Sequence, residues 1–404
     1  MRFGIDFTRL YSSMCTSAFA HTFGTFIISW FVYDLTGSEL AMGSLWIINI
    51  GTQIFVQFSI GPYIDRFQRK SVMMVSESVR ILAYILLLII SFTGHLNAGI
   101  LYSVAFLTAV VVYDPPANAL VPNLVKKDQL VKANAHIAGT VQFMRLIALP
   151  IAGLVVASFS IYLAVFMVVF LFLISILFVS LIQEHRQSNK MVGNNWWSQF
   201  KKGLAVYRKQ KILIFLGFFI AVVNFSVFAT QVMYIPYVLE VLDGTSFSYG
   251  LFAASFPLGY IIGSFIVGKL SEPSQRLMYI LMIGALFIGG LTHVGLGLTT
   301  LLWAAIMIEV IAGIIMPVWN IYCNTLFQKL VPDDIRGQVF TVRFIFSKIA
   351  TPLGIIYGTF WAISFTLPTL FLSVGILTCV LTAVGVMSLG LYYLKRPETE
   401  EKIS

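Results

Sequence analysis

Charged residues are scarce in this chain of 404 amino acids. Asp, Glu, Lys and Arg together make up 11% of the residues, whereas hydrophobic residues make up 58%. A soluble protein of this size needs a much larger share of polar residues to cover its core. The composition therefore excludes an ordinary soluble protein.

Sequence signatures of enzymes and of nucleotide use are missing as well. The chain has no HExxH, no GxSxG, no catalytic carboxylate pair and no Cys/His constellation, so we expect it not to be an enzyme. It also lacks a GxxxxGK[ST] loop, which leaves an ion gradient as the energy source for any transport. Cys15, Cys323 and Cys379 stand apart in apolar segments and are interpreted as small core residues. We therefore expect no metal site and no cofactor.

Long apolar runs fill most of the chain. Each run of about 20 residues is long enough to cross roughly 30 Å of hydrocarbon as a helix. Their hydrophobicity does not alternate, which argues against the strands of a membrane barrel. The sequence thus predicts an all-α membrane protein with twelve transmembrane helices. The predicted spans are 10–33, 40–60, 71–93, 98–121, 133–157, 161–183, 211–234, 247–267, 277–296, 299–325, 338–361 and 367–394.

The placement of the basic residues predicts the orientation of these spans. The net charge is +9, and with the N-terminus inside the cell the Lys and Arg residues gather in cytoplasmic segments. The predicted outer loops have no Lys or Arg and contain Asp34, Glu39, Glu240 and Asp243 instead. This asymmetry is the positive-inside rule. We interpret the basic excess as a topology signal and not as a nucleic-acid-binding surface, and we expect both termini to be cytoplasmic. We also expect no cleavable signal peptide, because the first apolar run is too long for one.

The two halves of the chain resemble each other. Gly268, Glu272 and Arg276 repeat, at one constant offset, the spacing of an earlier set, Gly61, Asp65 and Arg69. Such an ordered series predicts two pseudo-symmetric six-helix bundles. The predicted parts are an N-terminal bundle (1–184), a cytoplasmic linker whose amphipathic pattern suits an interfacial helix (185–210), a C-terminal bundle (211–396) and a short cytoplasmic tail (397–404).

A dense cluster of charge separates the second and third predicted spans. The segment 61–70 matches the pattern G-x-x-x-D-R-x-x-R-[KR] at Gly61, Asp65, Arg66, Arg69 and Lys70. It therefore resembles the signature loop of the major facilitator superfamily. Three further segments resemble the bacterial macrolide-efflux branch and its siderophore-exporter relatives: DLTGSELAMGSL (34–45), PPANALVPNLVKKDQLVKANA (115–135) and LFQKLVPDDIRGQVFTV (326–342).

This resemblance covers essentially the whole chain and implies the major facilitator fold. It implies a secondary transporter of the bacterial plasma (inner) membrane that acts by alternating access, and we expect it to act as a monomer. The branch implies proton-coupled efflux of a small amphiphilic compound such as a macrolide-like drug. One motif departs from drug antiporters, since their G-P-x-x-G-G reads Leu149-Pro150-Ile-Ala152-Gly153-Leu154 here. The fourth span also lacks the Arg that many antiporters have there, so these two motifs do not support antiport.

The charged loop also has a physical interpretation as an inner gate. Gly61 permits close approach of a helix where the second span ends. We expect Asp65 to reach the positive N-terminal end of the eleventh helix, while Arg66, Arg69 and Lys70 anchor the loop at the inner leaflet. Such a contact exists in only one of two transport states. The alternative is that the basic residues only set the topology, and the loop at 268–276 is assigned a secondary role.

Ionisable side chains inside spans are functional candidates because their insertion into the bilayer is costly. Glu77 and Arg80 are spaced to pair on one helix face, and Asp114 is placed to meet Arg80 or Arg69. We predict that Glu77, Arg80 and Asp114 form a charge relay, as in related transporters.

Proton coupling is assigned to Glu309, Asp114 and His21, in that order. Arg145 and Lys348 are cations in the middle of the fifth and eleventh spans, and Lys348 is the predicted partner of Glu309. The alternatives are a static Glu309–Lys348 bridge that fixes helix register and, for His21, an ordinary core histidine.

Substrate-binding residues are expected mainly on the seventh and tenth helices, which line the cavity in the fold that the chain resembles. Amides and aromatic rings there suit a bulky amphiphilic compound, although a polar stripe can also serve helix packing. The candidates are Asn224, Gln231, Asn320, Trp30, Phe228 and Trp319.

Other functions remain open at this point. They are translocation of a lipid, glycolipid or siderophore, uptake of a nutrient, and a non-transporting membrane sensor. A sensor needs a soluble output domain, and the longest hydrophilic stretch, 183–211, is short. Transport is therefore the leading prediction.

Overall fold

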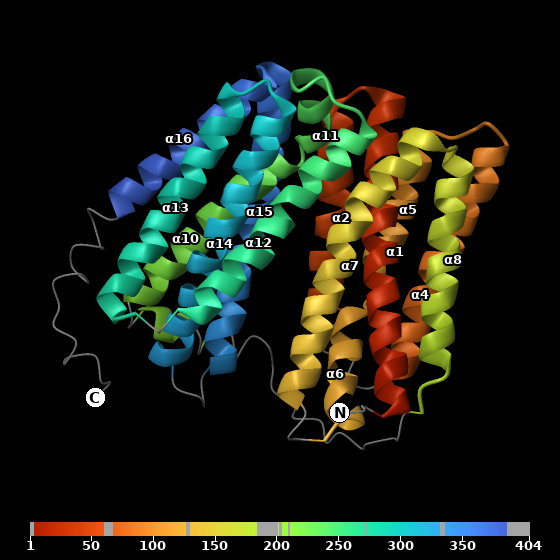
Figure 1. The fold of residues 1–404 in the computed structure, drawn as a ribbon, viewed down its shortest axis with the longest axis horizontal. Helices are drawn as coiled ribbons and strands as arrows, with labels where there is room; N and C mark the ends of the chain where they lie inside the picture. The colour runs from red at the N-terminus through yellow and green to blue at the C-terminus, as the bar shows by residue number, and fades with distance from the viewer. Residues whose placement is uncertain are drawn as a thin grey trace. The chain divides into compact units, whose positions relative to one another are not determined.

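The structure is a computed structural model that describes residues 4–59, 68–126, 130–183, 201, 204–208, 211–270, 273–331 and 336–385. Within these ranges the chain forms helices and no strand. It divides into two compact units, one of Met1–Met191 with Gly244–Ala254 and the other of Val192–Asp243 with Ser255–Ser404. Each unit is built from helices that run alongside one another (Figure 1).

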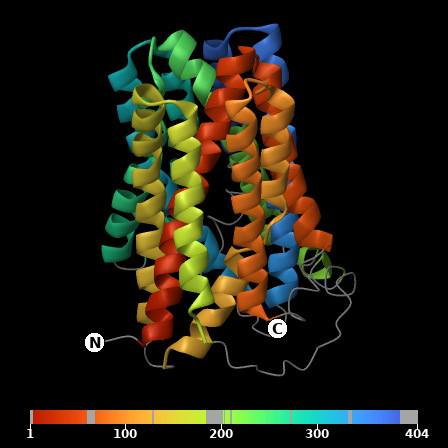
Figure 2. The same ribbon diagram turned by 90° about the vertical axis from the view of Figure 1, so that its right-hand side faces the viewer.

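The first unit contains the helices of the N-terminal half. They are α1 (Ile5–Thr36), α2 (Glu39–Ser59), α4 (Arg69–Phe92), α5 (Ala98–Val110), α6 (Asp114–Leu124), α7 (Leu130–Ser158) and α8 (Ile161–Ser180). α1 packs against α7 and α8, and α4 packs against α8. The neighbouring α1 and α8 are seen side by side in both views (Figure 1, Figure 2).

The second unit repeats this pattern of packing. Its helices are α10 (Lys211–Gln231), α11 (Tyr234–Pro236) with a π-helical turn (Tyr237–Val241), α12 (Ser246–Lys269), α13 (Gln275–Leu298), α14 (Leu302–Leu330), α15 (Arg336–Ser364) and α16 (Leu367–Gly385). The start of α12, as far as Ala254, belongs to the first unit. α10 packs against α15 and α16, and α13 packs against α16. The first, third, fifth and sixth helices therefore pair alike in both halves, as the internal duplication predicts.

Twelve long helical segments account for the predicted spans. Eleven of them are long and apolar enough to cross a membrane within the described part of the chain. α15 is 29 residues long and supplies the twelfth, although Arg343 and Lys348 make it less apolar. The prediction of an all-α membrane protein with twelve transmembrane helices is confirmed.

The fourth span differs from the prediction of one continuous helix over 98–121. α5 ends at Val110 and α6 begins at Asp114, with Val111 as an extended C-cap. Pro115 and Pro116 follow at the first positions of α6, where a missing N–H is tolerated but the preceding helix cannot continue. Asp114 is consequently the first residue of a new helix and not a residue two turns inside a long one.

Glycine lets the helices of the second unit approach closely. Gly354 and Gly358 on α15 face the backbone of α10, and a methyl group at Gly358 would collide with the carbonyl oxygen of Ala229. Gly259 on α12 likewise meets the backbone of α14 at Val310. Small residues one turn apart are the usual device for close packing of membrane helices, because lipid provides no hydrophobic driving force.

Part of the predicted linker belongs to the second unit's core. Residues 204–208 are helical, and Tyr207 is 1% exposed. Its ring lies 6.4 Å from that of Phe327, between ring centroids. The described end of the linker is therefore packed against protein, while most of the predicted interfacial helix lies outside the described residues.

Candidate functional site

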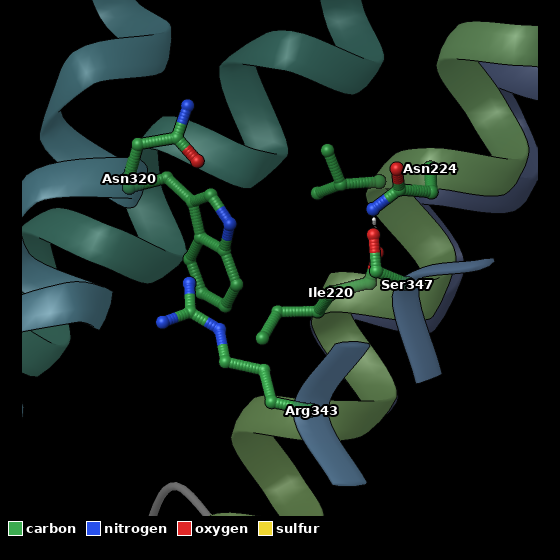
Figure 3. A pocket seen from close by; sticks show the side chains of 7 residues that line it. Ile220, Asn224, Asn320, Arg343 and Ser347 are labelled. Atoms are coloured by element: carbon green, nitrogen blue, oxygen red, sulfur yellow. Dashed lines mark hydrogen bonds between the residues drawn. The ribbon is translucent and has the colours of Figure 1, made fainter. Parts of the chain in front are cut away.

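A cavity of about 320 Å³ lies within the second unit, between α10, α14 and α15. Asn224 and Asn320 stand on opposite sides of it, and the Arg343 side chain extends toward the Asn320 side (Figure 3). The seven described residues that line it are Ile220, Val223, Asn224, Trp319, Asn320, Arg343 and Ser347. Three of them, Asn224, Asn320 and Trp319, are substrate-binding candidates from the sequence.

The two amides are held by hydrogen bonds to neighbouring groups. Asn224 Nδ2 donates to the Ile220 carbonyl oxygen at 2.8 Å, one turn back on α10. Asn320 Nδ2 donates to Tyr260 Oη of α12 at 3.3 Å. Each bond fixes one face of an amide that has both donor and acceptor capacity. The cavity thus offers oriented hydrogen-bonding groups on two walls.

Trp319 forms the apolar wall of the cavity. It is 2% exposed and packs edge-on against Phe219, with 6.1 Å between ring centroids. Ile220 and Val223 of α10 add aliphatic surface to the cavity lining. A cavity with a few oriented polar groups on an apolar lining is typical of a small-molecule site.

Arg343 and Ser347 lie one turn apart on α15 and were not among the substrate-binding candidates. The Arg343 guanidinium lies over the Phe327 ring, 4.7 Å from its centroid. Arg343 falls inside the eleventh predicted span, 338–361. Its four-residue spacing from Ser347 is the signal that would have suggested a common face.

Glu309 is buried at 3% exposure on α14, seven residues after the helix begins. Tyr234 Oη donates to its Oε1 at 2.8 Å. Among the described residues the structure records no ion pair between Glu309 and Lys348, so the predicted partnership is wrong. The reason is one of position, since the short helix α11, which follows α10, brings the Tyr234 hydroxyl to the carboxyl group. Glu309 also lies nearer the start of its helix than the predicted middle depth.

A buried charge pair occupies the first unit. Arg80 Nη1 lies 3.6 Å from Glu77 Oε2, with the Glu77 side chain fully buried. Ser175 Oγ of α8 donates to Glu77 Oε1 at 2.9 Å, and Arg80 Nη1 donates to Ser17 Oγ of α1 at 3.1 Å. The local pairing expected for these two residues is therefore present, and the pair links α4 to α1 and α8.

Asp114 does not join Glu77 and Arg80. Its Oδ2 lies 3.8 Å from Arg145 Nη2 of α7, and both side chains are largely exposed, at 66% and 43%. The predicted contact of Asp114 with Arg80 or Arg69 is therefore replaced by one with Arg145. The break between α5 and α6 accounts for this difference, because Asp114 begins a separate helix and its position does not follow from one continuous helix over 98–121.

Several residues of the predicted gate lie outside the described part of the chain. These are Gly61, Asp65, Arg66 and Glu272. Arg69 and Lys70 open α4, and Lys70 Nζ donates to the carbonyl oxygens of Ser180 and Ile182 at 2.7 and 2.8 Å. Lys70 therefore stabilises the C-terminal end of α8.

The other candidates are dispersed. Gly268 and Arg276 are exposed near the ends of α12 and α13. His21 is half-buried on α1, one turn from Ser17, while Trp30 stacks on Phe26 with 6.5 Å between centroids. Gln231 and Phe228 on α10 and Lys348 on α15 are half-buried and are not among the seven described residues of the cavity.

Comparisons with known sequences agree with this architecture. The profile of the Major Facilitator Superfamily matches residues 10–355. The chain is 23% identical to the uncharacterized MFS-type transporter YvqJ of Bacillus subtilis (strain 168), over 95% of this chain and 92% of the relative. It is 20% identical to macrolide efflux protein A of Streptococcus pyogenes, over 89% of each.

Solved structures share the fold at low sequence identity. A mutant of the nucleoside transporter NupG has a TM-score of 0.72 and 12% identity, covering 97% of this chain and 100% of that chain. A POT family transporter in complex with 5-aminolevulinic acid also has a TM-score of 0.72 and 12% identity, over 96% of both chains. The superfamily profile spans most of the sequence and the twelve-helix fold agrees with it. The chain therefore belongs to the Major Facilitator Superfamily, and it is a membrane transporter rather than an enzyme.

Proposed function

We propose that the protein exports small amphiphilic compounds across the bacterial plasma membrane by alternating access, driven by proton entry. The observation that carries this proposal is the cavity at Asn224, Trp319 and Asn320, where amides and an indole face one space within a membrane-spanning bundle. The similarity to a macrolide efflux protein supports the direction of transport. The positive-inside pattern supports cytoplasmic termini, and the two bundles are assigned to 1–184 and 211–396.

Glu309 is the proposed proton carrier. It is a buried carboxyl whose hydrogen-bond partner is a neutral hydroxyl, Tyr234 Oη at 2.8 Å. A tyrosine hydroxyl donates to a carboxylate and accepts from a protonated carboxyl, so it serves both protonation states. Asp114 and His21 rank behind it: Asp114 is exposed beside Arg145, and His21 is half-buried on α1.

The inner gate is proposed at the loop that carries Asp65. In the state with a closed cytoplasmic side, Asp65 contacts the start of the eleventh helix, and such a contact shifts the balance between states by about 1–3 kcal/mol. Lys70 holds the beginning of α4 to the end of α8, which gives the loop a fixed base.

A growth-inhibition panel in a transporter-deficient bacterial host tests this function. Chemically diverse amphiphiles are compared in cells that express wild type, Glu309→Gln or Asp114→Asn at matched membrane levels. The proposal expects resistance to at least one compound class with wild type and its loss with Glu309→Gln. Sensitisation by wild type indicates uptake instead, and an unchanged growth profile for every compound, with unchanged cellular accumulation, favours a sensor.

A further inference from the structure

The cavity of the second unit carries one formal charge on its described lining, and that charge is positive. Asn224, Asn320 and Ser347 are its other polar residues, and Trp319, Ile220 and Val223 are apolar. We propose, on the basis of the transport function above, that this cavity binds an anionic amphiphile, with Arg343 contacting its carboxylate and the indole wall contacting its apolar body.

The shape of the guanidinium suits this role. Arginine presents its N–H donors in a planar fork that matches a carboxylate with two parallel hydrogen bonds, and it stays charged at all relevant pH values. The Phe327 ring lies 4.7 Å from the Arg343 guanidinium carbon and supports one face of the fork. The opposite end of the side chain is fixed on α15, so the donors are directed to the Asn320 side of the cavity (Figure 3).

The remaining lining provides complementary contacts for the rest of the ligand. Trp319 contributes its indole to the lining with 2% of the residue exposed, and its edge-on contact with Phe219 keeps the ring in place. The volume of about 320 Å³ falls in the range of small-molecule pockets, which begins at roughly 300 Å³. A compact aromatic acid is therefore the simplest ligand that meets both ends of the site.

The same arrangement selects against cations. A positively charged ligand would bring a like charge beside Arg343 in a bundle where water screening is weak, and this repulsion is strong at low dielectric. The site thus distinguishes ligands by charge even where their apolar bodies are identical. The competing interpretation is that Arg343 only extends its head toward the membrane surface, as long basic side chains do near helix ends.

Three probes of one shape and three charges test the proposal: 2-naphthoate, 2-naphthamide and 2-naphthylmethylammonium. Their affinities for the full-length protein in lipid nanodiscs are measured by isothermal titration calorimetry. We expect 2-naphthoate to bind at least tenfold more tightly than 2-naphthamide, and the ammonium compound to bind most weakly.

In the Arg343→Gln variant, the affinity for 2-naphthoate is expected to fall to that for 2-naphthamide. The affinity for 2-naphthamide is expected to stay within about twofold of the wild-type value, which reports that the site is folded. Lys269→Gln is the matched control, because Lys269 is also a cation stacked on a phenylalanine, with Nζ 4.2 Å from the Phe265 centroid, but lies outside the cavity lining. This control is expected to keep the wild-type order of affinities.

Any one of three results overturns the proposal. They are failure of 2-naphthoate to bind, equal affinities for the three probes, and an unchanged preference for 2-naphthoate in the Arg343→Gln variant. Failure of the proposed anion site and failure of the proposed transport function give different results. Preferential 2-naphthoate binding without gradient-driven transport of any compound would refute the proposed function and leave the site intact. Gradient-driven export with no charge preference in binding would refute only the anion site.

Discussion

At the scale of single residues, the proposed proton coupling rests on the contact between Glu309 and Tyr234. The hydroxyl belongs to the short helix α11, and the carboxyl belongs to α14, so the bond joins two separate helices of the second unit. A hydrogen bond to a charged group contributes about 1.5–3 kcal/mol, which corresponds to roughly a tenfold or larger change in rate if it is used during transport.

Replacement of this hydroxyl provides the first prediction. Tyr234→Phe is expected to reduce gradient-driven transport about tenfold relative to downhill exchange, because Glu309 loses its donor. The double variant with Glu309→Gln should be no slower than Glu309→Gln alone, since both act on one contact. Tyr357→Phe is the control: its hydroxyl donates to Ser373 Oγ at 3.0 Å, so the ratio of the two rates should stay unchanged. Additive losses in the double variant contradict the assignment.

The Glu77–Arg80 pair leads to a prediction of stability. Glu77 is fully buried, and removal of Arg80 leaves its charge without compensation. Loss of one partner of a buried pair costs about 3–5 kcal/mol. Arg80→Gln is therefore expected to lower the unfolding free energy in mixed micelles strongly, and Arg80→Gln with Glu77→Gln should recover part of that loss. A double variant less stable than Arg80→Gln would show that the pair does not act as a unit.

Arg343 illustrates what the sequence leaves undetermined at this scale. Arg343 and Lys348 both fall inside the predicted span 338–361, but of the two only Arg343 is among the described residues that line the cavity. The rotation of α15 about its axis decides between them, and this rotation is set by packing against α10. The observed partner of Glu309 does not follow from the sequence for a similar reason, because the contact depends on where the short helix α11 places Tyr234 and not on the periodicity of α14.

Close packing of α15 against α10 is the main feature at the scale of elements. A Cβ at Gly358 would meet the backbone of Ala229, whereas a Cβ at Gly284 on α13 has open space. Gly358→Ala is expected to destabilise the protein by about 1–3 kcal/mol through overpacking. Gly284→Ala is expected to be neutral or slightly stabilising, because alanine favours helix. Chemical unfolding in mixed micelles compares the two variants, and equal stability would contradict the close packing.

The fourth span shows how far element boundaries follow from sequence. Its position was predicted from the apolar run, but the break before Asp114 was not, although Pro115 and Pro116 are plain in the sequence. Proline ends the preceding helix and opens the next one, and this local rule overrides the continuous hydrophobicity. The error moved Asp114 to the wrong neighbour, with Arg145 as the observed partner.

The internal duplication organises the whole molecule. Both halves pair their first helix with their fifth and sixth, and their third with their sixth, which the repeated Gly61 and Gly268 segments indicate from sequence alone. Apolar length and basic-residue placement were sufficient for the number of spans, because the bilayer imposes both. The gate contact of Asp65 is expected in only one of the two transport states, and it stays a prediction.

Topology is testable on the whole chain. In a background without Cys15, Cys323 and Cys379, single cysteines are introduced by Asp34→Cys and Ser404→Cys. A membrane-impermeant maleimide added to intact spheroplasts is expected to label the first and to label the second only after lysis, because the positive-inside pattern places the termini in the cytoplasm. The reverse labelling pattern contradicts the orientation.

Coupled export is the central claim, and transport into proteoliposomes with an acidic lumen tests it most directly. The substrate is the compound to which expression gives the strongest resistance, and protein-free liposomes correct for passive partition. If protons leave the lumen as substrate enters, wild type will accumulate the compound against its gradient, a proton ionophore will abolish the accumulation, and Glu309→Gln will only equilibrate it. Two results would contradict the account. One is that wild type accumulates the compound equally with and without the pH gradient, and the other is that Glu309→Gln accumulates as much as wild type.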